Sequence, residues 1–209
     1  ESNARQVFIA TDNQKIFAMA ESFGASVCMT DSHHCSGTER IAQVSEQMNW
    51  PDSQVVINLQ GDEPLIAPEV INAVAEALSQ SEMTTAALLV NNISDYSDPN
   101  VVKVVVSTEG RALYFSRRTV PFVRDFSEKS PEKQLKAFPF LKHLGIYGYQ
   151  CKTLQRLVGY APSPLEQAEN LEQLRALENG IEISVCQVEY EAIGVDVPAD
   201  VQRVEALLK

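Results

Sequence analysis

The stretch that decides the fold is residues 55–64, which read VVINLQGDEP. The first five residues are mostly apolar and β-favouring, which predicts a buried strand. The strand ends at a turn, so Asp62 lies just past its carboxyl end. In open α/β sheets ligands bind outside those strand ends, and Mg²⁺ takes one or two carboxylates together with substrate phosphates. A simple turn with a solvated acid explains this stretch equally well on its own.

Length and charge limit the class of protein. A chain of 209 residues can bury one sizeable core, which predicts a single domain. Lys and Arg total 17 against 28 Asp and Glu, a formal net charge of −11. Because binding to a nucleic-acid backbone depends on basic patches, this balance argues against a nucleic-acid polymer as partner. A nucleotide is still compatible with it, since a nucleotide needs only a few local cations and backbone donors.

Hydropathy and cysteine spacing predict a cytoplasmic protein that is not bound to a membrane. No apolar run reaches the length of a membrane span, and the first residues do not form a signal peptide. The four cysteines are widely spaced without a Cys-x-x-Cys pair, which favours a reduced compartment. Residues 33–35, His-His-Cys, are interpreted as an exposed loop, because three adjacent side chains do not easily converge on one metal ion.

Strand and helix patterns alternate along the first half of the chain. Strands are expected at residues 7–10, 26–29, 55–59 and 84–90, and helices at residues 13–23, 37–48 and 68–78. This β-α-β-α-β rhythm predicts a parallel, doubly wound sheet.

The middle of the chain has a different pattern. Two neighbouring strands are expected at residues 101–106 and 112–116, and residues 121–140 are expected to form a long loop or arm. The strand at residues 143–149 contains two glycines, which often mark the close approach of another backbone or of a ligand. The α/β pattern then returns with a helix, a strand and a helix, at residues 164–178, 181–188 and 198–208.

Residues 36–40, SGTER, stand at the start of a predicted helix. Free backbone N–H groups, the hydroxyl of Ser36 and the guanidinium of Arg40 together make a site for an anion or a nucleobase. Ser36 followed three residues later by Glu39 also matches a capping box, which is the commoner role of this pattern. The two roles are compatible.

A second carboxylate follows the last predicted strand. Residues 194–200, GVDVPAD, place Asp196 before a helix that has Pro198 in its first turn. If Asp62 and Asp196 converge, they supply two acidic ligands to Mg²⁺. N-capping of that helix by Asp196 or Asp200 is the alternative.

The other candidates are polar side chains in the second half of the chain. Glu169, Glu172 and Gln173 share one face of the predicted 164–178 helix, which suits the hydroxyls of a polyol, although a solvated charged face is commoner. A sugar acid needs a cation or a bidentate donor for its carboxylate, and Arg117 and His143 stand at strand boundaries. The alternatives are a surface ion pair for Arg117 and a structural role for His143.

Seven segments occur together, in the same order, in one enzyme family. They are SGTER (36–40), NLQGDEP (58–64), ALYFSR (112–117), HLGIYGY (143–149), SPLE (163–166), LEQLR (171–175) and GVD (194–196). In these motifs the chain resembles the 3-deoxy-manno-octulosonate (Kdo) cytidylyltransferases, or CMP-Kdo synthetases. Each motif is weak alone, but their order across essentially the whole chain is specific.

The resemblance implies a fold and a reaction. The fold would be one nucleotide-diphospho-sugar-transferase-like domain, residues 1–209, with a Rossmann-like, mixed but mostly parallel sheet flanked by helices. A small β subdomain at about residues 101–150 would form the arm of a homodimer. The reaction would couple CTP and Kdo to CMP-Kdo and pyrophosphate for lipopolysaccharide synthesis.

The resemblance also implies roles for individual residues. Asp62 and Asp196 would be the catalytic carboxylates that bind Mg²⁺. The cytidine end of the nucleotide would be bound by Ser36, Gly37, Arg40 and Gln60. The Kdo pocket would be lined by Arg117, His143, Tyr147, Glu169 and Gln173.

The beginning of the chain departs from the family pattern. The family begins with a strand and a basic loop that holds the triphosphate, and no segment here matches that loop. Several tens of residues are therefore expected upstream of residue 1.

Three other functions compete with this one. The nearest is a cytidylyltransferase for another sugar acid, such as a sialic acid. A non-catalytic nucleotide-binding module is the alternative from a different class. A nicotinamide-binding Rossmann protein is disfavoured, because no Gly-x-Gly-x-x-Gly follows a predicted strand.

Overall fold

The computed structural model describes residues 1–189 and 198–207, and all structural statements refer to these residues. Asp196, one of the two predicted metal ligands, lies outside them. None of the helices described is long and apolar enough to pass through a lipid bilayer.

A six-stranded mixed sheet forms the centre of the fold, with the long strand β7 (Leu141–Gln150) in its middle. One edge of β7 pairs with β4 (Met83–Leu89), which in turn pairs with β8 (Ile183–Gln187). The other edge pairs with β3 (Val55–Asn58) and with β5 (Lys103–Val106), and β5 pairs with β6 (Ala112–Ser116).

The direction of β7 corrects the expectation of a parallel, doubly wound sheet. Strands β3, β4 and β5 are all antiparallel to β7, and only β8 pairs parallel, with β4. Four strands of the sheet, β3, β4, β5 and β8, therefore run the same way, as a mostly parallel sheet requires. Because β7 runs against them from the middle, most neighbouring pairs are antiparallel, and the mixed sheet that the family resemblance implied is confirmed.

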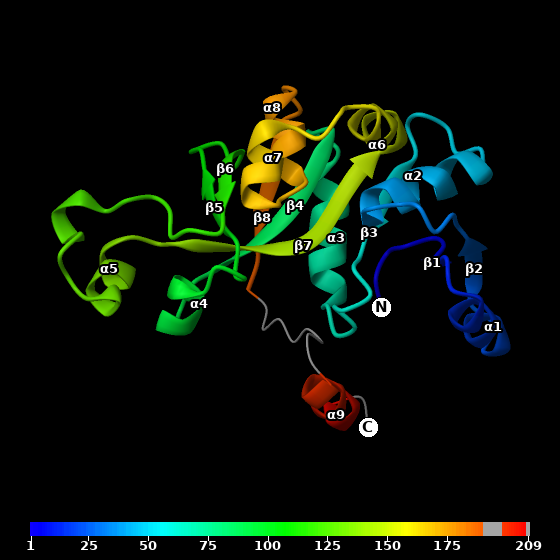
Figure 1. The fold of residues 1–209 in the computed structure, drawn as a ribbon, viewed down its shortest axis with the longest axis horizontal. Helices are drawn as coiled ribbons and strands as arrows, with labels where there is room; N and C mark the ends of the chain where they lie inside the picture. The colour runs from blue at the N-terminus through cyan, green and yellow to red at the C-terminus, as the bar shows by residue number, and fades with distance from the viewer. Residues whose placement is uncertain (190–197, 208–209) are drawn as a thin grey trace.

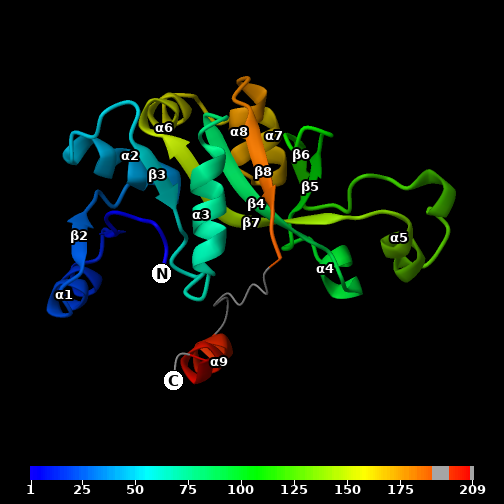
Figure 2. The same cartoon turned by 180° about the vertical axis from the view of Figure 1, so that it is seen from behind.

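Helices cover both faces of this sheet (Figures 1 and 2). Helix α3 (Pro68–Ala77) lies on one face, and α6 (Cys151–Val158), α7 (Pro164–Glu169) and α8 (Gln173–Glu178) lie on the other. Side chains of β4 point alternately to the two faces of the sheet and belong to two buried clusters. Met83 and Ala87 belong to the cluster beneath α6 and α8, whereas Ala86 and Leu88 belong to the cluster beneath α3. This period of two is the pattern of a strand that is buried on both faces.

A smaller parallel sheet lies at the amino-terminal end of the chain. It pairs β1 (Phe8–Thr11) with β2 (Ser26–Met29), which α1 (Gln14–Ser22) connects. The predicted helix start is confirmed, because the Asn13 side chain accepts a 2.9 Å hydrogen bond from the N–H of Lys15. Helix α2 (Gly37–Gln47) follows β2 and is capped by Ser36, as the SGTER pattern predicted.

The predicted 164–178 helix is wrong as one unit, because α7 and α8 are separate. The break falls at Asn170, whose φ of 52° lies in the left-handed region. Asparagine tolerates this conformation better than most residues do. The freed backbone oxygens of Glu169 and Asn170 accept hydrogen bonds from the Arg117 guanidinium, at 2.7 and 3.2 Å. The break is therefore fixed from outside the helix, which local spacing did not reveal.

The segment expected to be a long loop contains regular structure. A 3₁₀ turn at Arg124–Phe126 and α5 (Pro131–Ala137) lie within it, at the far end of an arm that extends from the body (Figure 1). Helix α4 (Ile93–Ser97) packs against α5, around a buried cluster of Val90, Tyr96 and Phe140. The last helix described is α9 (Pro198–Leu207), where a helix was predicted at residues 198–208.

The glycine at residue 148 stands where its neighbours crowd β7. A Cβ there would lie 2.4 Å from Thr84 Oγ1 and 2.9 Å from Leu78 Cδ1, which only glycine avoids. The crowding comes from side chains of β4 and of the end of α3, and not from the other backbone that was one of the two expectations. The second glycine, Gly145, has looser surroundings, with Gln60 Cγ 3.7 Å from its Cβ position.

Candidate active site

One hollow of about 230 Å³ brings together most of the chemistry-bearing segments. It lies on the face of the sheet that α6, α7 and α8 cover. Its polar lining comes from β7, from the end of β3, from α2 and from the α7–α8 junction, and consists of Gln60, His143, Tyr147, Tyr149, Thr38, Asn170, Glu172 and Gln173. Its apolar lining includes Met83, Leu157 and Leu171. Segments more than a hundred residues apart in sequence therefore share one wall.

A bulge interrupts the pairing of β7 beside this pocket. Tyr147 and Leu144 pair with the consecutive residues Thr85 and Ala86 of β4, so two residues of β7 between them have no partner. The Thr85 hydroxyl holds this bulge, since it lies 2.8 Å from the Ile146 carbonyl oxygen and 3.2 Å from that of Leu144. Alternate residues of a strand share one face, and His143, Gly145 and Tyr147 all line the pocket.

His143 is held as a neutral imidazole. Its Nε2 lies 3.0 Å from Thr85 Oγ1, whose single proton is directed at carbonyl oxygens, so Nε2 carries the hydrogen and donates. Its ring packs against Phe115 and Tyr147, with ring centroids 5.2 Å away in both cases. Burial lowers the pKa of His143 to about 3. The imidazole therefore offers Nδ1 as an uncharged acceptor and supplies no positive charge to a substrate carboxylate.

Glu172 connects the α7–α8 junction to the start of α2. Its carboxylate accepts hydrogen bonds from Ser36 Oγ at 2.8 Å and from Thr38 Oγ1 at 2.6 Å. Ser36 also accepts a bond from the N–H of Glu39, as an N-cap does, so its hydroxyl serves both the helix and the pocket. The sequence placed Glu172 on a polar helix face but gave it no specific role.

The start of α2 lies against the end of β3. A Cβ at Gly37 would be 3.6 Å from Asn58 Nδ2 and 4.0 Å from Gln60 Nε2. Gln60 lines the pocket, and the N–H of Glu63 donates to its backbone oxygen to close the turn. Asp62 is exposed in that turn. Of the stretch 55–64, Gln60 therefore lines the pocket, whereas Asp62 is not among its lining residues and stays a predicted metal ligand.

Arg40 lies at the ends of β1 and β2 rather than in the pocket lining. Its guanidinium donates to Thr30 Oγ1, to the Asp31 carbonyl oxygen at 3.5 Å and to Asp12 Oδ2 at 3.2 Å. These contacts tie α2 to the carboxyl ends of both strands. Nucleotide binding by Arg40 stays a prediction.

Arg117 and Glu169 support the pocket from outside its lining. Arg117 donates to backbone oxygens of Pro99, Glu169 and Asn170. The Glu169 carboxylate accepts from Ser116 Oγ at 2.7 Å and from the N–H of Arg117 at 3.0 Å. Burial raises the pKa of Glu169, but these hydrogen bonds outweigh it, and the pKa lies below its usual value. Direct Kdo contacts by either residue stay predictions.

Two tyrosines form the wall between His143 and α2. Tyr147 and Tyr149 are both buried, and their rings stack with centroids 6.1 Å apart. Burial raises the pKa of both phenols, and the Glu172 carboxylate raises both further. Both phenols are therefore neutral at physiological pH. Tyr147 was predicted to line the Kdo pocket, whereas Tyr149, Thr38 and Asn170 were not singled out.

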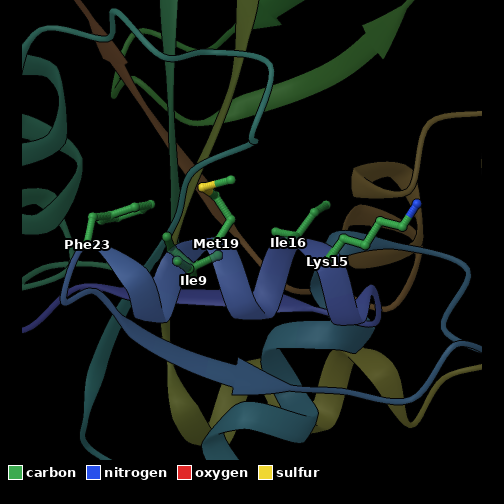
Figure 3. A pocket seen from close by; sticks show the side chains of 6 residues that line it. Ile9, Lys15, Ile16, Met19 and Phe23 are labelled. Atoms are coloured by element: carbon green, nitrogen blue, oxygen red, sulfur yellow. The ribbon is translucent and has the colours of Figure 1, made fainter.

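A second hollow, of about 250 Å³, lies over α1 (Figure 3). Ile16, Met19 and Phe23 project from one side of the helix and are exposed by 52%, 65% and 67%. Among the described residues, Lys15 is the only charged one in its lining, beside Ile9 and Ala20. The described lining has no carboxylate or amide side chain for a polar substrate, so this hollow is not the candidate active site.

A profile of the cytidylyltransferase family matches residues 1–183. The 3-deoxy-manno-octulosonate cytidylyltransferase of Haemophilus influenzae (strain 86-028NP) is 42% identical over 213 residues, which span 100% of this chain and 84% of the relative. The chain belongs to this family of cytidylyltransferases. The Yersinia enterocolitica (serotype O:8 / biotype 1B) protein of the same name is 44% identical over 211 residues, again covering 100% and 84%. The resemblance inferred from the seven motifs is therefore confirmed, and the chain is a nucleotidyltransferase.

Solved structures agree with this assignment. A CMP:2-keto-3-deoxy-manno-octonic acid synthetase complexed with CTP superposes with a TM-score of 0.85 at 35% identity, covering 98% of this chain and 81% of the other. A Bacillus anthracis glucose-1-phosphate thymidylyltransferase, at 14% identity and a TM-score of 0.58, covers 97% of this chain and 74% of its own. The second likeness shows the shared fold alone, and with it the nucleotide-diphospho-sugar-transferase fold is confirmed.

The neutral state of His143 predicts a pH dependence of stability. An unfolded histidine titrates near 6.5, whereas folded His143 titrates at about 3, so below pH 6.5 the unfolded chain binds a proton that the folded chain does not. His143 should therefore contribute a loss of stability of about 1.4 kcal/mol for each pH unit by which the pH is lowered between pH 6 and pH 4. Urea unfolding of wild type and His143→Gln across this range measures the difference in slope.

The control is His33→Gln, which leaves His143 in place and should keep the wild-type slope. If His143→Gln and wild type lose stability equally between pH 6 and pH 4, the buried neutral imidazole is contradicted.

Proposed function

We propose that this chain transfers the cytidylyl group of CTP to the anomeric hydroxyl of Kdo and releases pyrophosphate, for lipopolysaccharide synthesis in the cytoplasm. The observation that carries the proposal is the shared pocket of Gln60, His143, Tyr147 and Gln173, which come from three separate family motifs. Relatives 42% and 44% identical over the whole chain are named for this activity. The CMP:2-keto-3-deoxy-manno-octonic acid synthetase that superposes with a TM-score of 0.85 was solved in complex with CTP.

The pocket chemistry suits a polyhydroxylated sugar. Gln60, Gln173 and Glu172 supply amide donors and carboxylate acceptors, and His143 Nδ1 supplies a neutral acceptor. The tyrosines 147 and 149 and Leu157 exclude water on the other side. Polar groups at fixed positions in a pocket determine the orientation of a small ligand.

The reaction is a single in-line displacement at phosphorus. The anomeric oxygen of Kdo forms a bond to the α-phosphorus of CTP, while the bond from that phosphorus to the oxygen of the β-phosphate breaks. The proton of the anomeric hydroxyl passes to solvent, and pyrophosphate leaves. Catalysis of this type depends on positioning and on neutralising phosphate charge.

Asp62 fits the part of a magnesium ligand. It is exposed in the turn that follows β3, two residues after the pocket residue Gln60. We propose Asp196 as the second ligand, because Mg²⁺ takes one or two carboxylates beside substrate phosphates. When bound there, Mg²⁺ supplies positive charge to the phosphate oxygens.

Substrate specificity is tested by pyrophosphate release. The full gene product should release pyrophosphate with CTP, Mg²⁺ and Kdo, and much more slowly when sialic acid replaces Kdo or UTP replaces CTP. Preference for sialic acid would assign the chain to another sugar acid. CMP binding without turnover under all conditions would instead indicate a binding module and would refute the proposal.

The carboxylate assignment predicts the effect of Asp62→Asn. The substitution removes a negative ligand from an exposed turn, so kcat should fall at least about a hundredfold, as for the loss of a major electrostatic group, with an unchanged Tm. The matched control is Asp52→Asn, the same substitution in the exposed turn before β3, which should retain activity. Turnover of Asp62→Asn at the wild-type rate would sink the assignment.

We further propose a homodimer formed through the arm. Leu113, Phe122 and Phe126, on β6 and the arm, expose 60%, 77% and 38% of their surface. Phe122 and Phe126 lie four residues apart in the arm, and exposed apolar patches are typical of protein interfaces. The arm also extends away from the body, where a second copy can reach it (Figure 1).

The dimer proposal predicts the mass in solution. Sedimentation equilibrium of residues 1–209 should give twice 23.1 kDa for the wild type and 23.1 kDa for the double variant Leu113→Glu/Phe122→Glu. Phe23→Glu, which changes an equally exposed residue beside α1, should remain dimeric. A monomeric wild type would overturn the proposal.

A further inference from the structure

The loop between β2 and α2 gathers three metal-binding side chains that the nucleotidyl-transfer chemistry does not use. One ligand atom each of Asp31, His33 and His34 lies within 4.8 Å of the others. The chain has only three histidines, and two of them stand here. The sequence argued against a site formed by His33, His34 and Cys35, but the fold replaces the thiol with the Asp31 carboxylate.

We infer that Asp31, His33 and His34 form a surface site for a divalent transition-metal ion of the zinc class. Two imidazole nitrogens and a carboxylate are a ligand set that Zn²⁺, Ni²⁺ and Cu²⁺ accept, whereas Mg²⁺ prefers oxygen ligands only. The site is therefore chemically distinct from the carboxylate site proposed at Asp62, and the inference does not depend on the proposed function.

The geometry needs only a small contraction. Ligand atoms about 2.0–2.2 Å from a tetrahedral Zn²⁺ lie roughly 3.4 Å from one another, somewhat closer than the 4.8 Å limit found here. Asp31 and His33 are exposed, so their side chains can rotate toward the ion without disturbing the core. The rings of His33 and His34 already lie next to each other, with their planes tilted by 41° and their centroids 4.7 Å apart.

Gln43 of α2 forms hydrogen bonds to two of the proposed ligands, as outer-sphere residues of metal sites do. Its Oε1 accepts from the backbone N–H of Asp31 at 2.8 Å and lies 2.7 Å from His34 Nε2, while its Nε2 donates to Asp31 Oδ2 at 2.9 Å. Because Oε1 is an acceptor, His34 Nε2 must be the donor, which leaves Nδ1 with a free lone pair. Hydrogen bonds of this kind fix the tautomer of metal-binding histidines.

The charges around the loop favour a cation. Glu39 Oε2 lies 3.9 Å from His34 Nδ1, so a second carboxylate reaches the same imidazole. The guanidinium of Arg40 contacts the backbone oxygen of Asp31, but Asp12 binds it from the other side. The whole chain carries a formal net charge of −11.

The test is titration of the untagged protein with Zn²⁺ alone, followed by calorimetry. The wild type is titrated beside Cys35→Ser, and the other variants are made in Cys35→Ser, because an exposed thiol is itself a possible zinc ligand. One saturable equivalent is expected, with Mg²⁺ failing to compete. His33→Ala and Asp31→Asn should each raise the Kd for Zn²⁺ at least about tenfold, and Gln43→Ala, which removes an outer-sphere contact, by about tenfold.

Ser32→Ala is the matched control, because it changes a non-ligand side chain in the same exposed loop and should keep the parent affinity. His33 is exposed, so loss of folding does not confuse its substitution, and circular dichroism checks this. Absence of a saturable site, or a Kd that His33→Ala leaves unchanged, would overturn the inference. Loss of all zinc binding with Cys35→Ser alone would assign the metal to the thiol and would overturn it as well.

Discussion

The structure depends on the pairing of β7 with three other strands. β4 pairs along one edge of β7, and β3 and β5 share the other, so β7 joins β3 and β4 to the β5–β6 pair. The Thr85 hydroxyl holds the bulge in β7 and accepts the hydrogen of His143. One buried side chain therefore stabilises both the central register and the orientation of the pocket wall.

Carboxylates around the α7–α8 junction connect this wall to the rest of the fold. Glu166 pairs with the buried Arg175, Glu169 binds Ser116 and the N–H of Arg117, and Glu172 binds Ser36 and Thr38. Each is partnered by at least two donors, so these acids organise the structure as well as adding to the net negative charge. Hydrogen bonds to a charged acceptor are stronger than neutral ones, which suits them to hold a helix break.

The two proposed ion sites differ in ligand chemistry. Asp62 offers a hard carboxylate in the turn that follows β3, where phosphate oxygens complete the coordination of Mg²⁺. The loop before α2 offers imidazole nitrogens, which select softer ions. The same helix connects the two regions, because Ser36 and Gly37 lie by the pocket and Gln43 holds the histidine loop.

The sequence by itself determined the family, the order of most elements, and the strand-end position of Asp62 and Gln60. These features follow from motif order and from the local periods of strands and helices. Only the tertiary structure decided that β7 lies in the middle of the sheet, that Asn170 breaks a helix, and that Asp31 joins the two histidines. Those outcomes depend on partners distant in sequence, such as Arg117 at the break and Thr85 at the bulge, and local spacing contains no record of them.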